Sequence, residues 1–199
     1  MAAVVIEPMQ STSGQTASDR FLKELRSVTK DNEAALIIDA TETGCGATGK
    51  GFWGFDGAAD YLVFGKRTQV EGYYSRPSDK ASNLSLGGDH LRLLQFKVIN
   101  EAITKDRLID KVELVGASLR KSIESVASKK QGITGVRGLG TSLFIDTPQE
   151  GDAAFKLQQH LLKEGVLTKL NGSRGVALKP ALILEQRHVD QFSAALSRF

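Results

Sequence analysis

The sequence has 199 residues, of which 41% are hydrophobic and 25% charged, and it predicts an ordinary globular protein with one compact domain or two small ones. The formal net charge is only +3, and acidic residues are interspersed with lysines and arginines, which excludes a basic stripe suited to a nucleic-acid backbone. A single cysteine, Cys45, excludes an internal disulfide and a cysteine-based zinc cluster, and is compatible with a reducing compartment.

The first third of the sequence predicts a unit of parallel sheet. Short apolar runs at 1–8, 34–39 and 60–65 indicate strands, the first of them beginning at the first residue. After the first strand, a helix that Asp19 could cap is predicted by apolar residues at helical spacing, namely Phe21, Leu22, Leu25 and Val28. The order strand, helix, strand is typical of a parallel sheet, and the glycine-rich run TETGCGATGKGFWGFDG predicts a loop.

The rest of the sequence predicts helices and short strands. Apolar spacing indicates one helix over 89–103, with Asp89 as its cap, and a second over about 106–128. Beyond them we expect two short strands within GITGVRGLGTSLFIDT, a helix over 151–164, strands around VLTKL and VALKPALIL, and a last helix from Glu185. This order predicts an α/β fold with a small antiparallel sheet, and the pattern favours a boundary near residue 104.

Two chemically reactive residues follow predicted strands. Asp39 closes one apolar strand and Lys66 follows another, so in a parallel sheet both are expected at the carboxyl edge, where ligands of open α/β sheets bind. A buried lysine can be driven toward its neutral, nucleophilic form and make a Schiff base, and a carboxylate facing a pyridine nitrogen keeps that nitrogen protonated. Pyridoxal phosphate needs these two groups. Taken singly, however, Asp39 also suits a loop or cap position and Lys66 a solvated one.

Six segments, taken in order, resemble the carboxyl-terminal half of class III pyridoxal-phosphate-dependent aminotransferases. They are IEPMQSTSG, LIIDATETGCGATGKGFWGFD, YLVFGKRTQVEG, SNLSLGGD, VRGLGTSLFIDTP and GVALKP. The resemblance covers the whole chain and is strongest for the branch of lysine 6-aminotransferase and 4-aminobutyrate aminotransferase. It implies a partial α/β fold-type I aminotransferase: residues 1–104 would be an edge-truncated piece of the large cofactor-binding domain with its interdomain helix, and residues 105–199 the small carboxyl-terminal α/β domain.

The resemblance also implies roles for individual residues. Asp39 would meet the pyridine nitrogen of pyridoxal 5'-phosphate, and Lys66 would form the Schiff base and shuttle the proton. Ser85 stands where the family has a threonine that binds the cofactor phosphate across a dimer interface, and its hydroxyl keeps that role. Asn83 matches an asparagine of the same loop. The implied reaction transfers an amino group from an omega-amino donor, such as lysine or 4-aminobutyrate, to 2-oxoglutarate.

Three positions depart from the family's pattern. Glu42 replaces a neutral amide near the cofactor's phenolic oxygen, which this carboxylate would repel unless it is protonated. Thr12 and Lys179 align with a glutamate and an arginine that switch the site between its amino-donor and keto-acid substrates. Lysine could meet a carboxylate as a point charge but lacks the bidentate fork of arginine, so Lys179 is expected to be a plain surface lysine.

The resemblance assigns part of the family's site to an amino-terminal half that would precede this sequence. The glycine and serine loop for the phosphate, the aromatic that stacks on the ring and the arginine for the substrate carboxylate belong to that half. We therefore expect a homodimer or an obligate partner that supplies it. Two hypotheses remain open: a working aminotransferase once the site is completed, or a catalytically degenerate half kept as a scaffold or interaction subunit of a larger complex.

Other candidate sites have weaker support. The run GATGKG (46–51) lacks the terminal Ser or Thr of a phosphate-binding P-loop and opens no evident helix. The histidines have no partners at ligand spacing, so no metal site is expected at His90, His160 or His188. No targeting segment and no apolar stretch of membrane-spanning length is visible, which leaves the cytoplasm or the mitochondrial matrix as the expected location.

Overall fold

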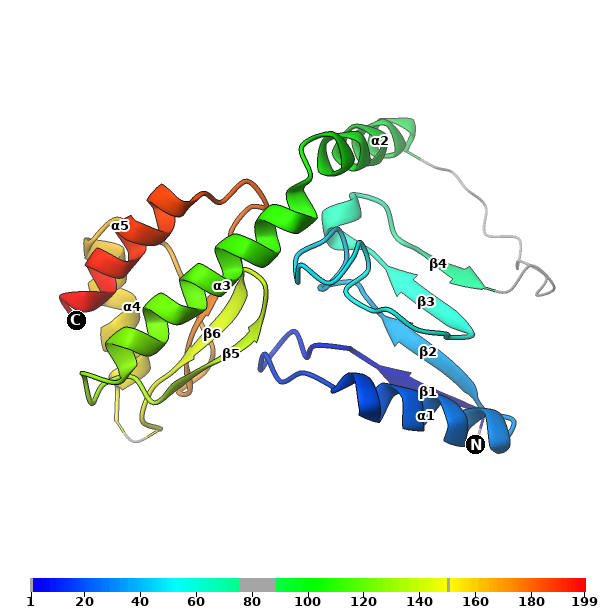
Figure 1. The fold of residues 1–199 in the computed structure, drawn as a ribbon, viewed down its shortest axis with the longest axis horizontal. Coiled ribbons are helices and arrows are strands. Elements are labelled where there is room, and N and C mark those ends of the chain that lie inside the picture. The colour runs from blue at the N-terminus through cyan, green and yellow to red at the C-terminus, as the bar shows by residue number, and fades with distance from the viewer. Residues whose placement is uncertain (1, 76–88, 150) are drawn as a thin grey trace.

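In its described residues the chain forms two four-stranded sheets that lie side by side, one from each half of the sequence (Figure 1). The computed structural model describes residues 2–75, 89–149 and 151–199. Helix α3 (Leu108–Ala127) runs across the second sheet, and α2 (His90–Lys105) leads into it from above the first sheet (Figure 1). No helix in the described part of the chain is long and apolar enough to cross a membrane.

The first sheet has its strands in chain order: β1 (Ala3–Ile6), β2 (Ala35–Asp39), β3 (Tyr61–Phe64) and β4 (Gly72–Ser75). The first three strands pair in parallel, and β4 pairs antiparallel with β3. Helix α1 (Asp19–Asp31) connects β1 to β2. The predicted parallel unit is therefore confirmed.

Three details of the first sheet differ from the prediction. The first strand is shorter than 1–8, because only Ala3–Ile6 pairs with β2. Ser18, not Asp19, caps α1, since the Ser18 hydroxyl accepts a hydrogen bond from the Phe21 N–H at 3.1 Å. Strand β4 was not expected, because its two tyrosines are too short a signal beside the neighbouring glycine.

The second sheet is antiparallel throughout, with the strand order β5-β6-β8-β7, which confirms the prediction for this half. Its elements in chain order are β5 (Gly135–Leu139), β6 (Ser142–Asp146), α4 (Ala153–Lys163), β7 (Lys169–Leu170), β8 (Gly175–Leu178) and α5 (Gln186–Ser197). Asp89 caps α2 as expected, because its carboxylate accepts the Leu91 N–H at 3.0 Å. The strand around VALKPALIL stops at Leu178, ahead of Lys179 and Pro180.

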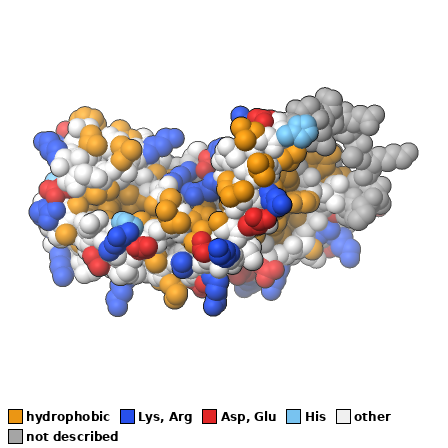
Figure 2. Space-filling model, turned by 90° about the horizontal axis from the view of Figure 1, so that it is seen from above, with side chains coloured by type: hydrophobic (Ala, Val, Ile, Leu, Met, Phe, Trp, Pro, Cys, Tyr) orange, Lys and Arg blue, Asp and Glu red, His pale blue; other side chains and the backbone are white. Residues whose placement is uncertain are grey.

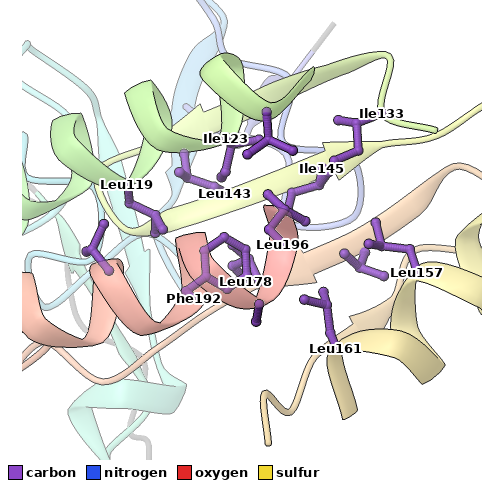
Figure 3. Packing of buried hydrophobic residues seen from close by; sticks show 14 residues of the cluster. Leu119, Ile123, Ile133, Leu143, Ile145, Leu157, Leu161, Leu178, Phe192 and Leu196 are labelled. Carbon is purple, nitrogen blue, oxygen red and sulfur yellow. The ribbon is translucent and has the colours of Figure 1, made fainter. Parts of the chain in front are cut away.

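The second sheet and three helices enclose the main hydrophobic core. Figure 3 shows side chains from α3, α4, α5 and the strands pointing toward one another. The residues labelled there are Leu119, Ile123, Ile133, Leu143, Ile145, Leu157, Leu161, Leu178, Phe192 and Leu196. Burial of this apolar surface is the main stabilising contribution of the carboxyl-terminal half.

Close backbone contacts join the two halves. A Cβ on Gly14 would lie 2.3 Å from Cδ2 of Phe144, so the loop after β1 rests directly on the ring of Phe144 from β6. A Cβ on Gly140 would lie 2.6 Å from the carbonyl carbon of Thr48. A Cβ on Gly116 of α3 would lie 2.3 Å from the carbonyl carbon of Gly140. Larger residues at these glycines would separate the sheets or displace α3.

Two adjacent leucines of α4 provide a test of this packing. Leu161 is fully buried at 0% exposure and Leu162 is 49% exposed. We expect Leu161→Ala to lower the free energy of unfolding by about 2–5 kcal/mol, because it leaves a cavity in the core. Leu162→Ala, the matched control in the same helix, should cost less than about 1 kcal/mol. Urea unfolding measures both, and equal losses would contradict the orientation of α4.

Candidate active site

The ends of three parallel strands collect charged side chains at one edge of the first sheet. Glu7 directly follows β1, Asp39 is the last residue of β2, and Lys66 comes two residues after β3 ends. Asp39 Oδ1 accepts a hydrogen bond from the Thr41 N–H at 3.0 Å, and Glu7 Oε2 accepts one from the Ser11 N–H at 2.6 Å. The prediction that Asp39 and Lys66 meet at one edge is confirmed, because β2 and β3 pair in parallel.

The backbone at Lys66 turns sharply away from the sheet. Gly65 is extended, with φ −178°, and Lys66 is left-handed, with φ 55°, at the start of the short helix η1 (Lys66–Thr68). A Cβ on Gly65 would lie 3.3 Å from Cγ of Glu71 and 3.6 Å from Cγ2 of Thr41, so a larger residue would crowd this turn. Left-handed backbone is uncommon for lysine and is often retained at functional sites.

Glu42 bridges two lysines from different sheets. Its Oε1 accepts a hydrogen bond from Lys66 Nζ, and its Oε2 lies 3.4 Å from Lys179 Nζ. Lys179 follows β8, donates to the Ser11 carbonyl at 3.2 Å, and places its ammonium 5.8 Å from the ring centroid of Phe144. Lys179 lies at the surface, as expected, but its side chain is 29% exposed and is ion-paired with Glu42.

Mutual pairing holds both partners in their charged forms. Burial on its own raises the pKa of Glu42, but the hydrogen bond from Lys66 and the charge of Lys179 outweigh it, and the pKa is lowered. The pKa of Lys66 is raised, chiefly by its hydrogen bond to Glu42 and also by the charges of Asp39 and Glu7. The Lys66 side chain is 58% exposed and paired with a carboxylate, which agrees with the solvated alternative and not with a buried, neutral lysine.

The other predicted positions are distributed as follows. Thr12 is exposed in the turn beside Ser11, whose carbonyl meets Lys179. Ser85 and Asn83 lie outside the described residues.

Burial raises the pKa of the Cys45 thiol to about 11, so this cysteine is not a reactive thiolate at neutral pH.

The glycine-rich run 46–51 serves packing. A Cβ on Gly46 would lie 2.6 Å from Cγ1 of Ile109, and one on Gly49 would lie 3.0 Å from the Cα of Glu113, both in α3. These left-handed glycines allow the loop to rest on α3, and no helix follows the loop as a P-loop requires.

Two of the histidines make contacts within the small α/β half. His160 Nε2 lies 2.9 Å from the Ala195 carbonyl, and His188 Nδ1 accepts from the Glu185 N–H at 3.0 Å as part of the cap of α5. Across residues 2–75, 89–149 and 151–199, no three His, Cys, Asp or Glu side chains are grouped to hold a metal ion.

Sequence reasoning missed three contributors to this edge. Glu7 follows its strand as Asp39 and Lys66 follow theirs, so the same reasoning about strand ends could have found it. The Ser11 carbonyl binds Lys179, and Arg67 Nη1 donates to the Pro180 carbonyl at 3.5 Å. Neither contact has a local sequence signal, because each joins segments from different sheets.

An open groove of about 700 Å³ lies on the face of the first sheet beside Lys66. It is lined by Ile37, Thr41, Tyr61, Val63, Phe64, Gly65, Lys66, Glu71, Gly72 and Tyr73. Asp39 lies on the same face as Ile37, because alternate residues of a strand share a face. Lys66 therefore lines this groove, and Asp39 is not one of its lining residues but lies on the same face of the sheet.

Comparison with known proteins identifies the family of the chain. The family model described as aminotransferase class III matches residues 1–199. The chain belongs to the class III aminotransferases. It is 33% identical to 4-aminobutyrate aminotransferase of Dictyostelium discoideum, with 100% of the chain and 42% of the relative covered. For the mitochondrial 4-aminobutyrate aminotransferase of Mus musculus, the identity is 31% and the coverage 99% of the chain and 41% of the relative.

Solved aminotransferase structures share the fold. Lysine aminotransferase from M. tuberculosis superposes with a TM-score of 0.86 at 26% identity, over 98% of this chain and 48% of that one. Acetylornithine aminotransferase from Elizabethkingia anophelis gives a TM-score of 0.87 at 23% identity, over 98% of this chain and 53% of that one. This class III aminotransferase chain is thus a partial fold-type I structure that spans less than half of its curated relatives.

The residues at this edge fit part of a pyridoxal-phosphate site. Class III aminotransferases depend on this cofactor, and the open groove presents Lys66 on its lining and Asp39 on the same face of the sheet. An amine can bond the cofactor's aldehyde, and a carboxylate can pair with its ring nitrogen. The apolar side chains Ile37 and Val63 suit the flat face of the ring.

The ion pair of Glu42 predicts a defined pH dependence. Its contribution to stability is present above the ordinary pKa of 4.5 for Glu42 and is lost as the pH falls through the lowered folded-state value. The contribution of Lys66 is present below its ordinary pKa of 10.5 and is lost as the pH rises through the raised value.

We therefore expect Glu42→Gln to lower the free energy of unfolding at pH 7 by less than about 1 kcal/mol, because exposure of Lys66 screens the pair. The difference should begin to shrink below pH 4.5 and vanish once the pH has fallen through the lowered pKa of folded Glu42, where its carboxylate is protonated. Urea unfolding at pH 7, 5 and 3 measures this, with Glu24→Gln, from an exposed pair with Arg20, as control. A loss for Glu42→Gln that persists undiminished at pH 3 would contradict the ionic origin.

Proposed function

We propose that this chain contributes Lys66 and Asp39 to the cofactor site of an aminotransferase. The amino donor would be an omega-amino compound such as lysine or 4-aminobutyrate, and the acceptor 2-oxoglutarate. The observation that carries the proposal is the meeting of Asp39 and Lys66 at the carboxyl edge of β2 and β3, beside one groove. The donor class is supported by relatives named 4-aminobutyrate aminotransferase and by the fold shared with a lysine aminotransferase.

Each residue has a distinct part in the proposed mechanism. Bound pyridoxal phosphate supplies an aldehyde and an electron-withdrawing ring. Lys66 is the nucleophile and moves a proton at its Nζ, and the Asp39 carboxylate holds a proton on the ring nitrogen. Glu42 orients Lys66, and Lys179 offers a point charge to a substrate carboxylate. Ser85 would bind the phosphate, and residues 1–104 and 105–199 would form the large-domain piece and the small domain.

A second candidate function is a scaffold or interaction subunit that has lost catalysis. The observation that favours it is Glu42, which holds Lys66 as a cation and so withholds the neutral amine that nucleophilic attack needs. The two candidates differ in whether Lys66 bonds an aldehyde.

The proposed site is tested by trapping the cofactor on the protein. With the chain mixed with pyridoxal phosphate, we expect an absorbance band of the Schiff base and, after borohydride reduction, a pyridoxyl adduct on the Lys66 peptide by mass spectrometry. Lys66→Ala should abolish both, because it removes the nucleophile. Lys50→Ala, in the glycine-rich loop, is the matched control and should change neither.

An adduct spread evenly over surface lysines would contradict a built site at Lys66. Absence of the band from the chain alone would exclude autonomous cofactor binding. Its appearance only on addition of a separately produced amino-terminal half would support the enzyme and count against the scaffold subunit.

We also propose that the chain works as a homodimer or with a partner that completes the site. Apolar side chains gather on the face that contains α2 (Figure 2), where Leu91 is 62%, Leu94 56% and Val98 55% exposed. Val5 is 63% exposed on β1, which is the outermost strand at one side of the first sheet in the described structure. Exposed apolar surface of this kind typically marks an interface.

This assembly is tested by sedimentation velocity. We expect the chain to associate at micromolar concentration, because burying these apolar side chains is favourable. Replacing Leu91 and Leu94 together by serine should shift the distribution toward the monomer, and Leu167→Ser, at an 86% exposed leucine elsewhere, should not. A clean monomer of the unmodified chain would contradict the proposal.

A further inference from the structure

Glu42 uses each of its carboxylate oxygens for a different half of the molecule. Oε1 accepts from Lys66, which follows β3 of the first sheet, and Oε2 faces Lys179, which follows β8 of the second. The glutamate side chain is 24% exposed and that of Lys179 is 29% exposed, so this pair is less screened than an ordinary surface pair. One carboxylate therefore links the nucleophilic lysine to the second sheet.

Charges around the two lysines make this link asymmetric. Lys66 also faces the carboxylates of Asp39 and Glu7, whose charges act on it from the ends of β2 and β1. Lys179 has the Ser11 carbonyl and the ring of Phe144 beside it. Lys66 is therefore stabilised as a cation by three acids, and Lys179 relies on Glu42 for its ionic partner among the contacts described at this edge.

We propose that Glu42 is a positioning residue that divides its carboxylate between Lys66 and Lys179 and passes to Lys179 when Lys66 becomes neutral. This inference rests on the proposed function, in which neutral Lys66 is the nucleophile. The proton of Lys66 goes to solvent, which its 58% exposed side chain reaches. The contact that Lys179 makes between the two sheets therefore depends on the charge of Lys66, and the charge of Lys66 depends in turn on that contact.

The lowered pKa of Glu42 supports this arrangement, because its carboxylate stays available to either lysine across the neutral range. A neutral amide at position 42 could hydrogen-bond Lys66 but would not favour its cationic form by charge. The two substitutions that disrupt the bridge should therefore shift the pKa of Lys66 in opposite directions. Glu42→Gln removes a stabilising anion, and Lys179→Met removes both a competing partner and a repelling cation.

The test measures the rate at which a neutral acetylating reagent modifies Lys66, from pH 7 to 11, by mass spectrometry of the peptide that contains it. Only the neutral amine reacts, so the rate follows the deprotonated fraction. At pH 8 we expect Glu42→Gln to raise the rate about threefold and Lys179→Met to lower it about twofold, with the titration midpoint moving correspondingly. Glu24→Gln and Lys50→Met remove the same groups from exposed pairs and should leave the rate unchanged.

Opposite shifts cannot come from loss of structure, since unfolding would speed the modification in both variants. If the modification rate of Lys66 changed in the same direction in both variants, or changed in neither, the proposal would be overturned. The measurement needs no cofactor and so separates the two proposals. A pyridoxyl adduct at Lys66 without opposite shifts in rate would support the proposed function and contradict the role of Glu42. Opposite shifts in rate without an adduct would support the role of Glu42 and contradict the proposed function.

Discussion

Parallel pairing of β1, β2 and β3 is the constraint on which the candidate site depends. Because the three strands run in one direction, their carboxyl ends deliver Glu7, Asp39 and Lys66 to the same edge. The register is held by Leu36 and Ile38, which are fully buried at 0% exposure on the opposite face from Asp39. A slip of one residue would expose these two side chains and turn Asp39 away from the groove. Burial of the apolar face of β2 therefore determines that Asp39 lies on the face with the groove.

The second sheet completes the arrangement through the alternation of β8. Leu178 points into the core, so the next residue, Lys179, projects toward the side where Phe144 rests on Gly14. That contact allows the Lys179 ammonium to reach both the Ser11 carbonyl and Glu42. The core of the carboxyl-terminal half thus positions a charge at an edge formed entirely by the other sheet.

Much of the fold and part of the site follow from sequence. Apolar runs and helical spacing predict the parallel unit, the antiparallel sheet and its helices, and Asp39 and Lys66 stand out because each follows a strong strand signal. The charge state of Lys66 could not be predicted, because its partner Glu42 becomes a neighbour only through the loop after β2. The contact of Glu42 with Lys179 spans 137 residues and depends on how two sheets meet, which no local pattern encodes.

The balance of charge at this edge bears on what it can accept. The carboxylates of Glu7, Asp39 and Glu42 stand near the ammonium groups of Lys66 and Lys179 and the guanidinium of Arg67, so this edge presents charges of both signs. In the proposed function, the carboxylates would attract the ammonium group of an omega-amino donor. In the proposed arrangement, a ligand carrying only carboxylates would compete with Glu42 for Lys179, and its binding would return Glu42 to Lys66. Glu42 would thereby link selection of the ligand to the charge of Lys66.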